Sequence, residues 1–97
     1  MQARELLNRR VVLSANEFAE LVIWQLARAH PGSAHQFRYR LAFVVSGKCV
    51  LRYDNESGKG DHRRRAGREM KYGFTTIDDL VSDFFKDVQR WRNENHG

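Results

Sequence analysis

The sequence has only one cysteine and no long apolar run, and each scarcity excludes a class of protein. Cys49 alone cannot form an internal disulfide or a multi-cysteine zinc site, so redox and zinc-finger functions are excluded. No apolar stretch approaches the length of a membrane helix, and the first residues lack the apolar core of a secretory signal. The spacing of helix-borne metal ligands is also missing. We therefore expect a cytoplasmic protein that uses neither a metal ion nor another cofactor.

The size and charge of the chain limit which classes of protein remain possible. At 97 residues the chain has the length of one compact domain, so residues 1–97 are expected to share one core. The net charge of +5 favours an acidic partner, either nucleic acid or an acidic protein. Residues 59–71 hold six cations and two anions, a net charge of +4 that leaves only +1 for the rest. This basic segment fits nucleic-acid binding, protein docking or a solvated loop.

Periodicity in the sequence predicts an α+β fold. Apolar residues from Ile77 to Trp91 recur on one helical face, which predicts an amphipathic helix over residues 76–93. Residues 9–53 are rich in β-branched and aromatic types broken by turn residues, and they predict an antiparallel four-stranded β-meander with the C-terminal helix packed across one face. Residues 1–8 fit a helix or a strand, and residues 54–73 are expected to be a Gly-punctuated loop, functional or disordered. The predicted strands span residues 10–14, 17–26, 36–45 and 48–53.

The turn that follows the third predicted strand determines which side chains share a face. A three-residue loop over residues 45–47 would pair Leu41 with Leu51 and make one face wholly apolar. The same register would place Arg40 opposite Arg52, with another arginine nearby, and opposed like charges are unfavourable in a sheet. The compensating charge is expected to be a bound anion, or else Glu17, Glu20 or a neighbouring acidic chain.

The basic segment contains a candidate for acid/base chemistry. An imidazole can gain or lose a proton near neutral pH, so His62 is that candidate. Asp54, Lys59 and Asp61 are near it in the sequence and could orient the ring or stabilise a pentavalent phosphate. A surface role is the alternative, because neighbouring side chains on an extended chain point apart. The other histidines, His30, His35 and His96, are expected to be structural or solvated. The candidate nucleic-acid ligands are Arg38, Arg40, Arg52, Arg63, Arg64, Arg65, Arg68 and Lys71, with Tyr53 and Tyr72 available to stack on bases.

Several segments of the sequence together carry a family resemblance. They are residues 18–24 (FAELVIW), 31–41, 53–63 (YDNESGKGDHR) and 74–88. YDNE followed by KGDH is the most specific of them, and the whole pattern resembles the TumE family of toxin–antitoxin toxins. The resemblance implies a bacterial or archaeal toxin that a helix-turn-helix antitoxin neutralises. It carries the family's polar motif onto residues 53–55 and 59–63. Arg64 stands where members often have a second histidine, which argues against a two-histidine mechanism.

The leading hypothesis is a toxin that acts on RNA as a metal-independent endoribonuclease. In it, the arginines hold phosphates, Lys59 stabilises the transition state, and His62 transfers a proton with Asp54 or Asp61 in support. The alternative is a non-catalytic module that blocks growth or translation by binding nucleic acid, the ribosome or the antitoxin. A third possibility is an interaction subunit in which an edge strand, 10–14 or 48–53, pairs with a partner strand.

Overall fold

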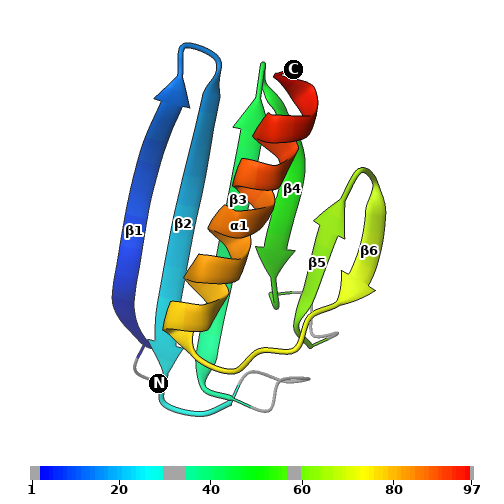
Figure 1. Ribbon diagram of the computed structural model, residues 1–97. Helices are drawn as coiled ribbons and strands as arrows, with labels where there is room; N and C mark the ends of the chain where they lie inside the picture. Colours follow the sequence, from blue (N-terminus) through cyan, green and yellow to red (C-terminus); the bar gives the residue numbers. More distant parts are fainter. Residues whose placement is uncertain (1–2, 30–34, 57–59, 97) are drawn as a thin grey trace.

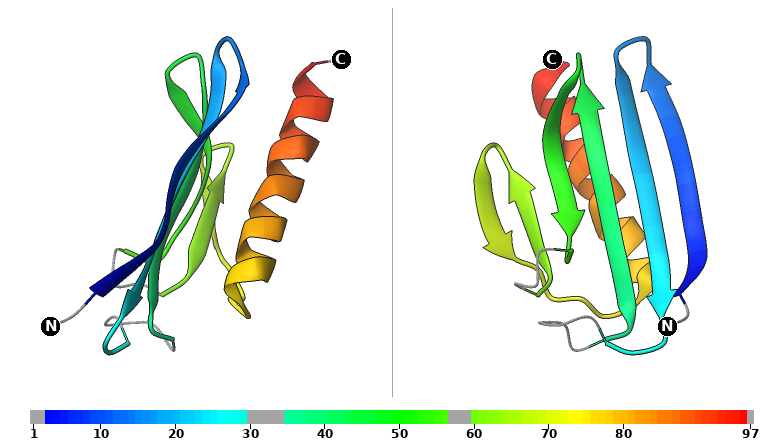
Figure 2. Two further views of the ribbon diagram at one scale, coloured as in Figure 1. Left: turned by 90° about the vertical axis from the view of Figure 1, so that its left-hand side faces the viewer. Right: turned by 180° about the vertical axis from the view of Figure 1, so that it is seen from behind.

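A computed structural model describes residues 3–29, 35–56 and 60–96, which form one antiparallel sheet with a helix across it (Figure 1). The strands lie side by side in chain order. Figure 2 shows the helix on one side of the sheet only, so we call that side the helix-covered face and the other the helix-free face. The elements are β1 (Ala3–Ser14), β2 (Glu17–Leu26), β3 (Phe37–Val45), β4 (Lys48–Asp54), β5 (His62–Arg65), β6 (Arg68–Lys71) and α1 (Ile77–Asn95).

Helix α1 forms where the sequence predicts it. The backbone N–H of Asp79 donates to the Thr76 side chain at 3.0 Å, which satisfies one of the N–H groups that a helix start leaves unpaired. Leu80, Phe84 and Val88 follow at four-residue intervals and are buried against the sheet. The prediction of an amphipathic C-terminal helix packed on one face is confirmed.

The helix-covered face of the sheet holds the core. Leu41 and Phe43 of β3 and Leu51 and Tyr53 of β4 are at most 2% exposed. Burial of such side chains stabilises the fold by about 1.5–3 kcal/mol each. Because successive residues of a strand point to opposite sides, the residues between them lie on the helix-free face. One strand therefore supplies both the core and a solvent-facing surface.

The prediction of four strands is wrong, because the sheet has six. β1 begins at Ala3, so residues 3–8, which fitted either a helix or a strand in the sequence, belong to a strand. β5 and β6 come from the segment expected to be a loop, and they form a hairpin around Ala66 and Gly67, which both have positive φ. Seven of the eight residues of these two strands are charged or histidine, with Met70 the exception. The hairpin therefore lacks the apolar alternation by which strands are detected.

The predicted three-residue turn between β3 and β4 is also wrong. Ser46 and Gly47 have φ values of 49° and 79°, which make a two-residue turn of type I′. A β-bulge at Val50 then shifts the register by one residue, so that Leu41 pairs with Tyr53. The bulge keeps the apolar side chains of both strands on one face, which is the pattern that the longer loop was invoked to explain.

Candidate functional site

Charged side chains of the helix-free face line up across β3, β4, β5 and β6. The pairing register places them in two adjacent rows, so backbone hydrogen bonding sets their spacing. The two rows are Ala42, Arg52, Arg64 and Glu69, then Arg40, Asp54, His62 and Lys71. We call Arg52, Asp54, His62, Arg64 and Glu69 the charged cluster.

His62 lies at the centre of the charged cluster. Its Nε2 is 2.9 Å from Asp54 Oδ1 and 3.2 Å from Glu69 Oε2. Its Nδ1 is 3.2 Å from the backbone carbonyl oxygen of Gly60. Both ring nitrogens thus face oxygen acceptors, and a doubly protonated ring can donate at both ends. The cluster therefore combines a proton donor with carboxylates that can accept a proton.

Two arginines of the charged cluster lie directly opposite each other. Arg52 of β4 pairs in register with Arg64 of β5, an unfavourable arrangement of like charges. Arg52 Nε is 2.6 Å from Asp54 Oδ2, and Arg64 Nη2 is 3.6 Å from Glu69 Oε2. The buried Arg52 Nε still makes no hydrogen bond of acceptable geometry within the described ranges. Opposed guanidinium groups with spare donors are suited to bind an anion that bridges them.

Arg38 and Arg40 extend the positive charge along β3. Their Nε atoms lie 4.0 and 3.9 Å from the carboxylate of Glu56, and all three side chains are well exposed. Arg40 lies opposite Asp54 in the sheet, so the predicted opposition of Arg40 and Arg52 is wrong. Asp54 and Glu56 therefore supply the compensating charge on this face.

The two carboxylates expected to compensate these arginines pair with other side chains, although Glu20 lies on the helix-free face in the row of Ala42 and Arg52. Glu20 contacts Arg10 at 2.9 Å. Glu17 is buried below the end of α1, where Arg92 Nε donates to it at 3.0 Å and His96 also binds it. Burial alone would raise the pKa of the Glu17 carboxyl, but hydrogen bonds, chiefly that with His96, outweigh it and lower the pKa. The contacts of both glutamates are therefore with residues outside the charged cluster.

Asp61 lies apart from His62 although the two are adjacent in the sequence. Its Oδ1 accepts a hydrogen bond from the Tyr39 hydroxyl at 2.6 Å and lies 2.8 Å from His35 Nε2. His35 Nδ1 accepts the backbone N–H of Phe37 at 3.1 Å, so the ring proton is on Nε2, which donates to Asp61. Burial, reinforced by the hydrogen bond to Asp61, raises the pKa of Tyr39. Asp61 therefore ties the start of β3 to the loop before β5 and does not contact His62.

Two candidate nucleic-acid ligands lie under the helix instead. Tyr53 is fully buried and donates its hydroxyl proton to Asp87 of α1. Arg63 Nη1 lies 3.2 Å from both the Tyr53 hydroxyl and Asp87 Oδ2. Burial, followed by the bond to Asp87, raises the pKa of Tyr53 to about 12, and the hydrogen bond with Tyr53 is the main cause of the raised pKa of Arg63. The Tyr53 ring therefore has no face open to a base.

The other candidates are scattered. Arg65 pairs with Glu94 of α1 at 3.4 Å on the helix-covered side. Tyr72 donates to Asp83 at 2.6 Å, and burial, followed by this bond, raises the pKa of its phenol. Arg68 and Lys71 are exposed on β6, and Lys71 shares the row of His62. Lys59 and His30 lie outside the described residues.

The sequence reasoning missed Glu69 and Glu56 as members of this surface. Glu69 was counted only as an anion of a loop, yet it lies opposite Arg64 and contacts His62. The signal that could have found it is the dipeptide at 66–67, because a two-residue turn there places residue 69 opposite residue 64. Glu56 follows β4 closely, and no spacing rule ties it to the arginines of β3.

In the part of the chain that the structure describes, no three His, Cys, Asp or Glu side chains are arranged to hold a metal ion. The helix in that part, α1, is not long and apolar enough to cross a membrane.

The sequence matches the family model described as toxin TumE over residues 3–92. The matched region contains all six strands and most of α1, and so includes both faces of the sheet. No curated protein and no solved structure matches the chain. The family match agrees with the resemblance in the polar motif before and within β5. The chain therefore belongs to the TumE family, whose members are the toxin components of toxin–antitoxin systems and each have an antitoxin partner.

Proposed function

We propose that this toxin acts on RNA in the cytoplasm as a metal-independent endoribonuclease, with its active site at the charged cluster. The observation that carries the proposal is the position of His62 between Asp54 and Glu69, with Arg52 and Arg64 beside the same carboxylates. Cleavage of RNA by its own 2′-hydroxyl needs a proton acceptor, a proton donor and cations that stabilise the phosphate. The cluster holds all three.

In the proposed reaction, Arg52 and Arg64 bind the oxygens of the scissile phosphate. Glu69 is the more exposed carboxylate, at 36% against 9% for Asp54, and it takes the proton of the 2′-hydroxyl. The 2′-oxygen then bonds to phosphorus while the bond from phosphorus to the 5′-oxygen breaks. His62 donates its proton to that 5′-oxygen, and Asp54 orients the ring. The products are a 2′,3′-cyclic phosphate and a free 5′-hydroxyl.

The cations around the cluster would hold the flanking nucleotides. Arg38, Arg40 and Lys71 lie on the same face, where backbone phosphates of a single strand can follow the positive charge. Lys59, which lies outside the described residues, is proposed to stabilise the charge of the transition state. The partner antitoxin is proposed to be of the helix-turn-helix type, as the family resemblance implies.

The test is induced expression in bacteria without antitoxin, followed by mapping of new RNA ends that carry a cyclic phosphate. Wild type and His96→Ala, a distant histidine control, are expected to arrest growth and produce such ends. His62→Ala and His62→Gln are expected to reduce cleavage by about 10²- to 10⁴-fold, because the proton donor is lost. Circular dichroism of the purified variants checks that they fold. Undiminished cleavage by a folded His62 variant would overturn the assignment.

A second function is favoured by the fact that both ring nitrogens of His62 already face acceptors within the protein. In that case the cluster binds RNA and blocks growth without cleaving it. Growth arrest with intact RNA in both the wild type and His62→Ala would support this binding function. Reversal of the Arg52 and Arg64 charges would prevent arrest under either function.

A further inference from the structure

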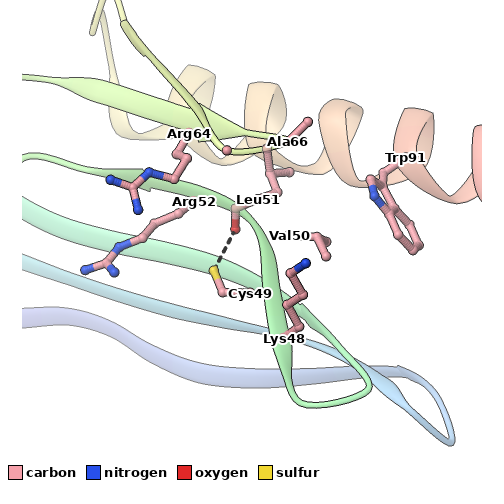
Figure 3. A pocket seen from close by; sticks show the side chains of 9 residues that line it. Lys48, Cys49, Val50, Leu51, Arg52, Arg64, Ala66 and Trp91 are labelled. Atoms are coloured by element: carbon pink, nitrogen blue, oxygen red, sulfur yellow. Dashed lines mark hydrogen bonds between the residues drawn. The ribbon is translucent and has the colours of Figure 1, made fainter.

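The first three residues of β4 leave an open strand edge. β5 pairs with β4 only from Leu51 to Asp54, and no other described strand covers that side of residues 48–50. A groove of about 470 Å³ lies here, between the edge of β4, the turn of β5 and β6, and Trp91 of α1 (Figure 3). An open edge offers backbone N–H and C=O groups to an added strand. The groove is therefore shaped for an extended segment.

The side chains that line the groove divide between the two sides of β4. Val50 and Trp91 pack against the core on the helix-covered side. Arg52 and Arg64 extend side by side on the other side (Figure 3). Alternate residues of an added strand point to opposite faces, so one would contact Val50 and Trp91 and the next would lie beside the arginines. The described lining residues include three cations and no carboxylate, so the second residue should be acidic.

The turn that forms one end of the groove is strained without local compensation. Ala66 has a φ of 52°, in the left-handed region where type I′ turns favour asparagine, aspartate or glycine. Ser46 has the corresponding position in the turn of β3 and β4, but its hydroxyl accepts a hydrogen bond from the Asn16 amide at 2.8 Å. Ala66 has no polar side chain to make such a bond, and it presents a small apolar wall to the groove. Strain of this kind is characteristic of binding sites.

We infer that the antitoxin binds at the open edge of β4, by adding an extended segment in which an apolar side chain is next to a carboxylate. Backbone hydrogen bonds to residues 48–50 pair the added segment with β4. The apolar and the basic side of the groove select its side chains. A carboxylate beside Arg52 and Arg64 would occupy the place of an RNA phosphate. Competition between the antitoxin and RNA for these arginines rests on the RNA function proposed above. Binding of the antitoxin at the edge of β4 does not.

Cys49 provides a reporter inside the groove. It is the one cysteine of the chain, it is exposed, and it lines the groove. Its alkylation rate is measured in the free toxin and in the complex with the antitoxin encoded beside it. The expected result is a rate at least about tenfold lower in the complex, because an added strand covers the thiol. Amide hydrogen exchange should slow at residues 48–50 in the same complex.

Charge reversal at the groove tests the inference without altering the charged cluster. Lys48 lines the groove, whereas Lys86 is exposed on α1 away from it. Lys48→Glu places a like charge beside the acidic segment, so antitoxin affinity should fall about tenfold or more while Lys86→Glu changes it less than about twofold. The Lys48→Glu toxin should still arrest growth when expressed alone, and the antitoxin should no longer neutralise it.

Four results would each overturn the inference. One is an unchanged alkylation rate in the complex, and another is an equal effect of Lys48→Glu and Lys86→Glu on antitoxin affinity. The third is a slower alkylation with unprotected amides at residues 48–50, which would mean docking without strand addition. Protection of Cys49 by RNA but not by the antitoxin would also contradict it. None of these readouts depends on RNA cleavage, so the proposed function can fail independently.

Discussion

Arg63 and Arg64 are neighbours on β5, yet the two faces of the sheet use them in opposite ways. Arg63 points beneath α1, where the Tyr53 hydroxyl and the Asp87 carboxylate both bind it at 3.2 Å. Arg64 points to the helix-free face, where it is 58% exposed and lies 3.6 Å from Glu69. The contacts under the helix therefore neutralise the charge of Arg63. Arg64 remains exposed on the helix-free face, where it can bind an anion. The difference shows that the basic composition of a segment does not by itself define a binding surface.

Loss of the core contact between helix and sheet should have the largest effect on stability. Phe84 is fully buried on α1, so Phe84→Ala should lower the free energy of unfolding by about 3–5 kcal/mol. Lys86→Ala, on the exposed side of the same helix, should change it by less than about 0.5 kcal/mol. Urea unfolding of the two variants measures the difference. A loss below about 1 kcal/mol for Phe84→Ala would show that α1 does not hold the core as described.

The helix-free face should tolerate some losses of charge and not others. Asp54 is 9% exposed and contacts both Arg52 and His62, so Asp54→Asn should cost about 1–3 kcal/mol of unfolding free energy. Glu56→Gln removes a carboxylate 3.9–4.0 Å from two exposed arginines and should cost less than about 0.5 kcal/mol. Equal costs in urea titrations would mean that burial does not distinguish these two carboxylates.

The tyrosines should report at high pH whether their buried hydrogen bonds are intact, two of which reach the helix. All three are held with raised pKa values, Tyr53 at about 12, because burial and hydrogen bonds to carboxylates favour the neutral phenol. Groups with raised folded-state pKa values stabilise the fold below their unfolded pKa, and that stability is lost as pH rises through the folded value. Ultraviolet titration should show no phenolate near pH 10 in the folded protein, and phenolate should appear with unfolding towards about pH 12. A tyrosine that titrates near pH 10 in a folded protein would contradict the buried contacts.

The smallest effect on stability is expected from substitution of Glu17, below the end of α1. Its pKa is lowered, so its contribution to stability is present above the ordinary pKa of a glutamate carboxyl and is lost as pH falls through the lowered folded value. Thermal unfolding across acid pH should therefore show a flatter pH dependence for Glu17→Gln than for the wild type. Glu20→Gln, at the exposed pair with Arg10, is the matched control. If both variants follow the wild-type curve, the hydrogen bonds of Glu17 do not contribute.

The sequence predicted those elements whose apolar pattern reaches the core. The helix is predictable because its apolar face repeats at helical spacing from Ile77 to Trp91, and β2 because apolar residues occur on both of its faces. The hairpin of β5 and β6 carries almost no apolar side chain, so its strands are held by backbone pairing and ion pairs that no periodicity reveals. The β-bulge at Val50 was not predicted for a similar reason, because a bulge changes the pairing register without changing the composition of the strand.

The candidate site was predictable in part. The pairing of His62 with Asp54 follows once β4 and β5 are known to be adjacent, and the sequence named both residues. Asp61 was grouped with His62 because the two are adjacent in the chain, but alternate residues of an extended segment point apart. Glu69 depends on the hairpin register, which the sequence reasoning did not have.

The proposed function places RNA on the helix-free face of the sheet. The most direct test is the affinity of a single-stranded RNA oligonucleotide for charge-reversal variants on the two faces, measured at one salt concentration. Arg40→Glu reverses a charge beside the cluster, and Lys86→Glu reverses a charge on the exposed side of α1. Arg40→Glu is expected to weaken RNA binding about tenfold or more, and Lys86→Glu is expected to change it less than about twofold. Equal losses of affinity in the two variants would mean that RNA does not bind at the helix-free face.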